Sequence, residues 1–82
     1  MKVLIVDDEP PARDRLRELL NRLSDYEPCG EAGNGAEALR LAASLQPDIV
    51  LLDIQMPGLD GLETARRLAE LAHPPAIIFV TA

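Results

Sequence analysis

The segment at residues 49–61 constrains the fold more than any other part of the chain. It begins with the apolar residues 49–52, which lack the spacing of an amphipathic helix and run directly into Asp53. Met-Pro-Gly at 56–58 then ends any regular structure. This pattern predicts a buried strand that presents a carboxylate at its C-terminal end. Ligands of open α/β sheets bind at the carboxyl ends of the strands, so Asp53 is a candidate functional residue.

Three other segments have the composition of strands. Continuous apolar residues at 3–6 and 76–80 predict two more buried strands. Residues 26–32 predict a weaker strand, which we place at an edge of the sheet because Pro28 has no backbone N–H to donate.

Amphipathic stretches between these segments predict three helices. The first has Pro11 in its first turn and runs to about residue 23, the second lies between the turn at 33–35 and Pro47 with Asn34 as its cap, and the third covers 62–72. Their expected apolar positions are Ala12, Leu16, Leu19, Leu20, Leu23, Ala38, Leu39, Leu41, Ala42, Leu45, Leu62, Ala65, Leu68, Ala69 and Ala72. We expect the arginines off the first stripe to be solvated and to pair with Asp14 and Glu18; they are Arg13, Arg15, Arg17 and Arg22.

Strict alternation of strands and helices is typical of right-handed βαβ crossovers. It predicts an α/β fold with a parallel sheet and helices on both faces. Strands that are apolar without alternation fit burial on both sides. With 82 residues, of which 48% are hydrophobic, the chain has material for one domain, residues 1–82, and one modest core.

Four oxygen-bearing side chains then lie on one rim of the sheet, namely Asp7, Asp8, Asp53 and Thr81. Neighbouring carboxylates raise one another's pKa unless a cation compensates them, and Mg²⁺ prefers such oxygen ligands. A carboxylate beside Mg²⁺ can attack a phosphoryl group and become an aspartyl phosphate, with a hydroxyl to steer an oxygen. Acids that merely cap helix starts would explain Asp7 and Glu9, but not Asp53 on the most apolar strand.

Composition indicates which partners and which cellular compartment to expect. The net charge is −6 and the basic residues are scattered, so we expect no nucleic-acid contact by this segment. Cys29 is the only cysteine, which excludes an internal disulfide, favours a cytoplasmic location and leaves a small buried apolar residue as its expected role. The apolar run at the N-terminus is too short for a signal peptide or a membrane span. His73 beside two prolines is expected to be a solvated connector rather than a base.

Three motifs resemble the receiver domain of two-component response regulators, and the match covers the whole chain. They are Val-Leu-Ile-Val-Asp-Asp-Glu-Pro at 3–10, Leu-Leu-Asp-Ile-Gln-Met-Pro-Gly-Leu-Asp-Gly at 51–61 and Phe-Val-Thr-Ala at 79–82. Asp-Asp-Glu-Pro-Pro-Ala-Arg and the last nine residues are most similar to regulators of the LytTR type, including the alginate regulator. The resemblance implies a flavodoxin-like (CheY-like) doubly wound sheet of strand order 2-1-3-4.

The resemblance also implies a function and its residues. Asp53 matches the phosphoacceptor, which a sensor histidine kinase supplies with a phosphoryl group, so the domain is not a turnover enzyme. Asp7 and Asp8 match the acidic metal-binding pair, and the backbone carbonyl of Gln55 matches the further Mg²⁺ ligand beside Asp53. Thr81 matches the switch hydroxyl. Regulators of this type control transcription through a separate DNA-binding domain after the receiver.

A complete receiver, by resemblance, continues into a fourth helix, a fifth strand that bears a lysine, and a fifth helix. These elements are not in the chain, and its only lysine, Lys2, is expected at the end of the first strand opposite the acidic rim. We therefore expect residues 76–80 to form an open edge and the sheet face beside the first helix to be uncovered. Two copies are expected to associate through that edge, that face or both.

Two other functions stay open at this point. In one, the same site is silent and the domain serves only as a protein interaction or dimerisation module. The other is an aspartyl-nucleophile hydrolase of the haloacid dehalogenase kind. It is the weakest of the three, because such enzymes have a second acid two residues after the nucleophile, where this chain has Gln55.

Overall fold

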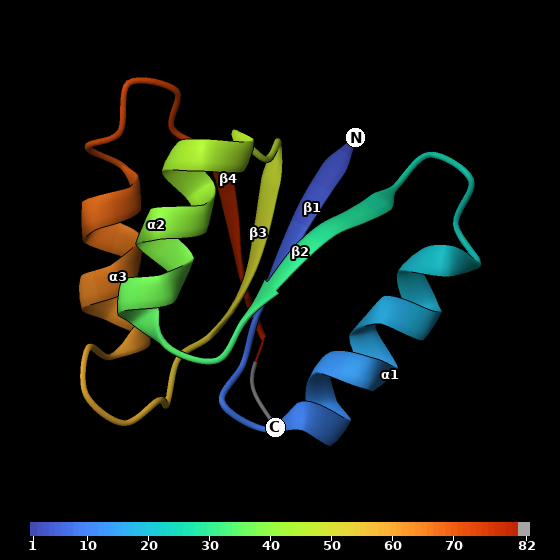
Figure 1. Cartoon of the computed structure of the whole chain (residues 1–82), viewed down its shortest axis with the longest axis horizontal. Coiled ribbons are helices and arrows are strands. Elements are labelled where there is room, and N and C mark those ends of the chain that lie inside the picture. The colour runs from blue at the N-terminus through green and yellow to red at the C-terminus, as the bar shows by residue number, and fades with distance from the viewer. Residues whose placement is uncertain (81–82) are drawn as a thin grey trace.

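A parallel four-stranded sheet with helices on both faces forms the part of the chain that the computed structural model describes, residues 1–80 (Figure 1). In chain order the elements are β1 (Lys2–Val6), α1 (Pro10–Asn21), β2 (Glu27–Ala32), α2 (Gly35–Leu45), β3 (Ile49–Asp53), α3 (Gly61–Leu68) and β4 (Ala76–Val80). The strand order is β2-β1-β3-β4, and every pair is parallel. The predicted α/β class and the order 2-1-3-4 are confirmed.

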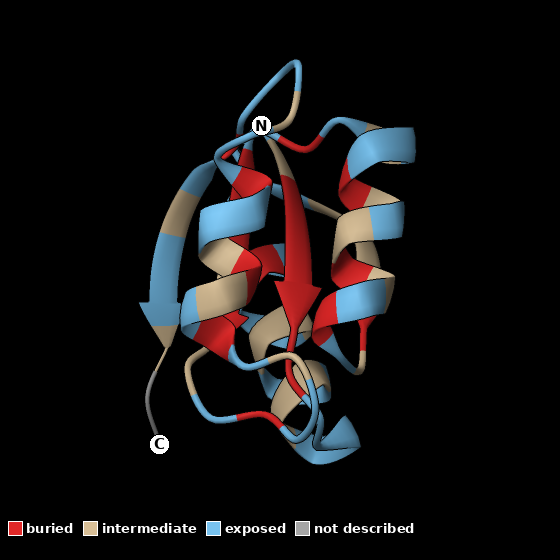
Figure 2. Cartoon of the chain, turned by 90° about the vertical axis from the view of Figure 1, so that its left-hand side faces the viewer, coloured by how far each residue is buried: buried red, intermediate tan, exposed pale blue. Residues whose placement is uncertain are grey.

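The core lies on both sides of β1, the most buried strand. Leu4 and Val6 pack with β3 and α2 on one face, and Val3 and Ile5 pack with Leu20 of α1 on the other. Because successive side chains of a strand point to opposite faces, a strand between two helical layers must be apolar at every position. Figure 2 shows the buried residues gathered on the inner strands and the facing sides of the helices, whereas β4 is largely exposed.

The edge strand β2 contains a bulge beside its proline. Pro28 lies opposite Val3, but Leu4 already lies opposite Gly30, so the pairing slips by one residue at Cys29. This agrees with the prediction that Pro28 belongs at a sheet edge. Cys29 is half-buried against the core, and that burial raises the pKa of its thiol.

The first helix differs from its prediction in which leucines it buries. It ends at Asn21, and Leu19 and Leu23 are 54% and 50% exposed, whereas Leu20 is buried. α1 packs over β1 and β2, so only its Leu16 and Leu20 side reaches the sheet. Leu23 instead borders an open apolar groove with Ile78 of β4. The predicted stripe was wrong for Leu19 and Leu23 because nothing in residues 1–80 covers that side.

The third helix is shorter than predicted. It ends at Leu68 rather than near residue 72, and Leu62 is 62% exposed. Its buried row is instead Gly61, Thr64 and Leu68, and Thr64 is satisfied by a hydrogen bond from Oγ1 to the backbone oxygen of Asp60 at 2.7 Å. Leu62 was therefore wrongly assigned to the core, as were Ala69 and Ala72, which are exposed.

The second helix has the predicted cap. Asn34 accepts a hydrogen bond from the backbone N–H of Glu37 at 2.8 Å. At the other end, Gln46 adopts the left-handed conformation with φ of 51°, and the Lys2 ammonium donates to the backbone oxygen of Leu45 at 2.5 Å. Lys2 thus stabilises the carboxyl end of α2. Its position at the end of β1 opposite the acidic residues is the predicted one.

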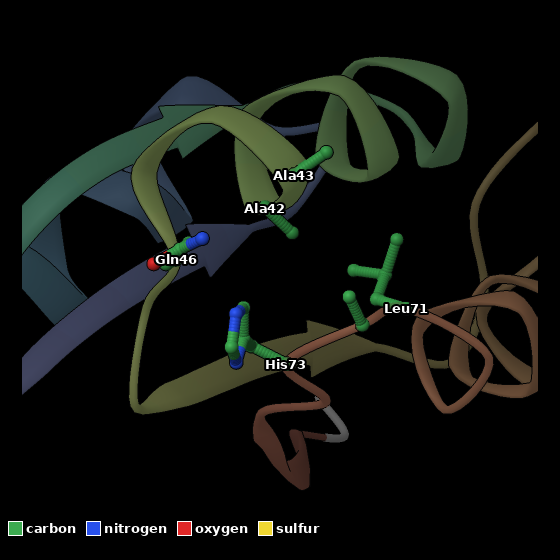
Figure 3. Close-up of a pocket in the computed structure, with 6 residues that line it drawn as sticks. Ala42, Ala43, Gln46, Leu71 and His73 are labelled. Carbon is green, nitrogen blue, oxygen red and sulfur yellow. The ribbon is translucent and has the colours of Figure 1, made fainter.

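Beside this end, α2 and the segment after α3 enclose a shallow hollow of roughly 240 Å³ (Figure 3). It is lined by Ala42, Ala43, Gln46, Leu71, Ala72 and His73. His73 is exposed there, in agreement with its predicted place in a connector. Within residues 1–80, no helix has both the length and the apolar character needed to cross a membrane.

Candidate functional site

Three carboxylates meet where β1 and β3 end. Asp7 and Asp8 follow β1, and Asp53 is the last residue of β3; Val6 and Leu52 pair side by side just before them. One carboxylate oxygen from each acid lies within 4.8 Å of the others. The chain therefore brings together three of the four rim residues expected from sequence. The fourth, Thr81, lies outside the described residues.

Hydrogen bonds orient two of these acids in the same way. The backbone N–H of Glu9 donates to Oδ1 of Asp7 at 2.9 Å, and the backbone N–H of Gln55 donates to Oδ1 of Asp53 at 3.1 Å. Each bond engages one oxygen and leaves the other available. Within residues 1–80, the Asp8 carboxylate has no hydrogen-bond partner, and the residue is exposed.

Burial and like charges act together on Asp53. Loss of hydration in its half-buried position raises the pKa of the carboxyl group, the charges of Asp7 and Asp8 raise it further, and the N–H of Gln55 partly opposes the rise. Ionisation of Asp53 therefore costs more free energy than ionisation of an isolated carboxyl group, and a cation at the site would offset this cost.

The donor set fits a hard divalent cation. It consists of carboxylate oxygens only, with no thiol or imidazole nearby in the cluster. Mg²⁺ takes few protein carboxylates and keeps several waters, which suits a partly exposed site with three acids. Gln55, expected as a carbonyl ligand, lies on the exposed loop two residues after Asp53.

A close backbone contact fixes the loop that follows Asp53. The N–H of Gly61 donates to the backbone oxygen of Ile54 at 3.0 Å. A Cβ at Gly61 would fall well inside van der Waals distance of the Asp53 carbonyl oxygen and the Ile54 backbone. Met56, 6% exposed, anchors the same loop in the core. The sequence indicated only a turn at this place. Glycine is needed at position 61 because the backbone of residues 53 and 54 lies too close for a side chain.

An arginine pair behind the acids was not predicted as part of the site. Arg13 Nη1 donates to the backbone oxygen of Asp7 at 2.7 Å, and Arg13 Nε lies 3.4 Å from Oε1 of Glu31. Arg17 binds the other oxygen of Glu31 at 2.6 Å and also pairs with Asp14 at 2.8 Å. The expectation of a solvated Arg13 was wrong, whereas the pairing of Arg17 with Asp14 is confirmed.

A hollow of roughly 230 Å³ adjoins the acids along α1. Its lining combines acidic and apolar side chains with one arginine, and consists of Asp7, Glu9, Ala12, Arg15, Leu16, Leu19, Asp53 and Val80. The free oxygens of the site are therefore reachable from outside the sheet.

Comparison with known proteins agrees with this geometry. Residues 3–82 match the sequence model of the response regulator receiver domain family. The whole chain is 62% identical to a positive alginate biosynthesis regulatory protein of Pseudomonas aeruginosa and 49% identical to the transcriptional regulatory protein BtsR of Escherichia coli. It covers 34% of each of these proteins. The chain thus spans about a third of the length of the curated relatives that it matches.

Solved structures share the fold. The response regulator domain of Thermotoga maritima CheB aligns with 99% of this chain at a TM-score of 0.93 and 34% identity, and 60% of that domain is covered. The response regulatory domain of mrkE from Klebsiella pneumoniae aligns with the whole chain at a TM-score of 0.88 and 39% identity, with 67% of that domain covered.

Proposed function

Because the chain belongs to the response regulator receiver domain family, we propose that it is a phosphoacceptor domain in which Asp53 accepts a phosphoryl group. One observation carries this proposal: oxygens of Asp7, Asp8 and Asp53 lie within 4.8 Å of one another at the carboxyl ends of β1 and β3. That is the edge of an open α/β sheet where ligands bind.

The chemistry assigns different tasks to the acids. Asp53 is the nucleophile: one oxygen stays bound to the N–H of Gln55, and the other attacks phosphorus. An oxygen–phosphorus bond forms as the bond from phosphorus to the donor's leaving group breaks, and the leaving group keeps that electron pair. Asp7, Asp8, Asp53 and the carbonyl of Gln55 are the proposed ligands of Mg²⁺, which when bound neutralises charge on the carboxylates and phosphoryl oxygens. Thr81 is the proposed switch hydroxyl.

The proposed phosphodonor is a sensor histidine kinase in the cytoplasm. Phosphorylation changes the state of the domain rather than turning over a substrate. For the whole protein we propose control of transcription, since the relatives that match over the full chain are named as regulators of this kind.

The two other functions lack specific support. A silent interaction module has no need of three converging carboxylates, one of which carries a raised pKa. A hydrolase of the haloacid dehalogenase kind requires a second acid two residues after Asp53, where Gln55 stands.

Self-association is a separate proposal for the chain of residues 1–82. Ile78 and Phe79 of β4 are 49% and 40% exposed, and the apolar groove beside α1 includes Ile78, Leu23 and Tyr26. An open apolar strand edge favours pairing with another copy.

The direct test of the phosphoacceptor proposal is incubation of the intact protein with a small-molecule phosphodonor. The protein should gain one phosphoryl group in the presence of Mg²⁺, and the gain should depend on Asp53.

A further inference from the structure

We infer that Arg13 is a positioning residue for the acidic site, holding the peptide between Asp7 and Asp8 in the orientation that directs both carboxylates toward one cation. The inference rests on the proposed function, because it concerns the proposed Mg²⁺ site. Within residues 1–80, Arg13 forms no hydrogen bond or ion pair with a carboxylate of the three acids.

The first observation is the atom that Arg13 binds. Its Nη1 donates to the backbone oxygen of Asp7 at 2.7 Å. This oxygen belongs to the peptide group that joins Asp7 to Asp8. A change in ψ of Asp7 or in φ of Asp8 rotates this peptide group and turns one acid relative to the other, so the hydrogen bond restrains their relative direction.

The second observation is what holds Arg13 itself. Its Nε lies 3.4 Å from Oε1 of Glu31, and its side chain is only 21% exposed. Glu31 pairs with Ile5 across the sheet, so it is fixed to the strand that leads to the acids. The guanidinium thus bridges β2 and the end of β1, and α1 lies alongside β2 on the face opposite α2 and α3 (Figure 1). A planar group with several donors suits such a bridge better than an ammonium does.

No second contact in residues 1–80 duplicates this bond. The N–H of Asp7 donates to Ala32 at 3.1 Å, and Oδ1 of Asp7 accepts from Glu9, but neither bond involves the Asp7 carbonyl. Without Arg13, that part-buried oxygen loses its partner and the peptide is free to turn.

Charge alone makes the opposite prediction for Mg²⁺ affinity. A cationic side chain close to a cation site repels the ion, so its removal should tighten Mg²⁺ binding. Positioning requires that the removal weaken it. The sign of the change therefore separates the two explanations.

Arg17 provides a matched control. It lies on the same helix and binds the same Glu31, at 2.6 Å, yet it makes no contact with the Asp7 peptide. Arg17→Gln removes the same charge and one partner of the same acid. A general loss of charge or of helix packing would appear in both variants.

The test is calorimetric titration of the intact protein with MgCl₂, with thermal unfolding of each metal-free variant alongside. We expect Arg13→Gln to weaken Mg²⁺ binding about tenfold, the scale typical of residues that orient metal ligands, and Arg17→Gln to change it by less than about twofold. Arg13→Lys keeps the charge but cannot make both contacts, so its affinity should fall between those of wild type and Arg13→Gln.

Two results would overturn the inference. Unchanged or tighter binding by a folded Arg13→Gln protein would show that Arg13 does not position the acids, and equal weakening by both Gln variants would show a general effect of the helix. If Arg13→Gln does not fold, Arg13→Lys decides, and wild-type affinity in that variant contradicts the role. Absence of Mg²⁺ binding by wild type would instead contradict the proposed function, and the inference with it.

Discussion

The backbone N–H of Gln55 donates a 3.1 Å hydrogen bond to Oδ1 of Asp53, and the same arrangement joins Glu9 to Asp7 at 2.9 Å. In both cases the backbone N–H of the residue two positions downstream donates to an acid at the carboxyl end of a strand, Asp53 as the last residue of β3 and Asp7 directly after β1. In each acid, Oδ1 accepts the backbone hydrogen bond and Oδ2 is available to the site.

Asp53 should make stability depend on pH. Its pKa is raised above the ordinary 3.8, chiefly by burial, so the folded state binds more protons than the unfolded state as pH rises above that value. Stability is therefore lost as pH rises from below the unfolded pKa through the folded pKa. Asp53→Asn should remove this loss and be more stable than wild type at pH 7 without metal. Urea unfolding across pH 3 to 7 checks this, and an equal pH dependence in the two proteins would contradict it.

Binding of Mg²⁺ should restore the stability that wild type loses when Asp53 ionises. A ligand that binds only the folded state, at 100 times its dissociation constant, stabilises by about 2.7 kcal/mol. Thermal unfolding with saturating MgCl₂ should show that gain in wild type and little of it in Asp53→Asn. A similar gain in stability in both proteins would show that Mg²⁺ binds at a site that does not include Asp53.

Substitutions of Asp7 and Asp8 should differ in their effects on folding stability. Asp8→Ala should weaken Mg²⁺ binding markedly and leave the metal-free fold as stable or more stable, because it relieves repulsion and breaks no hydrogen bond seen in residues 1–80. Asp7→Ala should also cost about 1 kcal/mol of folding free energy, since it removes the acceptor of the Glu9 N–H. Denaturant titrations of the two metal-free variants measure their free energies of unfolding. A lower free energy of unfolding for Asp8→Ala than for Asp7→Ala would contradict the prediction.

Gly61 should tolerate no side chain. Gly61→Ala places a methyl group against the backbone at Asp53 and Ile54, which cannot withdraw, and should cost about 2 kcal/mol or more. Gly33→Ala is the matched control, because a Cβ there meets only the Arg13 guanidinium at an ordinary 3.5 Å. Equal unfolding midpoints for the two variants would show that the loop after Asp53 adapts.

Residues 1–82 should associate through β4. Sedimentation equilibrium should show dimers at micromolar concentration, and Ile78→Lys, which charges a half-exposed position of that strand, should restore the monomer. A wild-type monomer at high micromolar concentration would contradict the proposal.

The parallel sheet could be predicted because it depends on local composition, whereas the strand order followed from the family resemblance. Continuous apolar runs indicated β1, β3 and β4, and alternation with helices indicated parallel crossovers. Burial on both faces holds for β1 and largely for β3, but it was wrongly predicted for β4, which is largely exposed. The exposure of Leu19, Leu23 and Leu62 could not be predicted. Helical spacing shows which side of a helix is apolar, but not whether a neighbouring element covers it.

Convergence of the acids was predictable for a similar reason. Asp53 ends β3 and Asp7 directly follows β1, and neighbouring parallel strands end at one edge. The role of Arg13 was hidden, because its partners are a carbonyl oxygen and an acid on another strand, Glu31. Sequence spacing along one helix reports only partners three or four residues away.

Phosphorylation of the intact protein by a small-molecule phosphodonor tests the central claim most directly. Intact mass and peptide mapping would be compared for wild type, Asp53→Asn and Asp60→Asn, with and without Mg²⁺. Asp60→Asn is the control, since it removes a carboxylate from the loop after Asp53 while asparagine still caps α3. We predict one phosphoryl group on Asp53 in wild type and Asp60→Asn, only with Mg²⁺, and none in Asp53→Asn. Labelling of Asp53→Asn equal to wild type, or no labelling of wild type, would contradict the assignment.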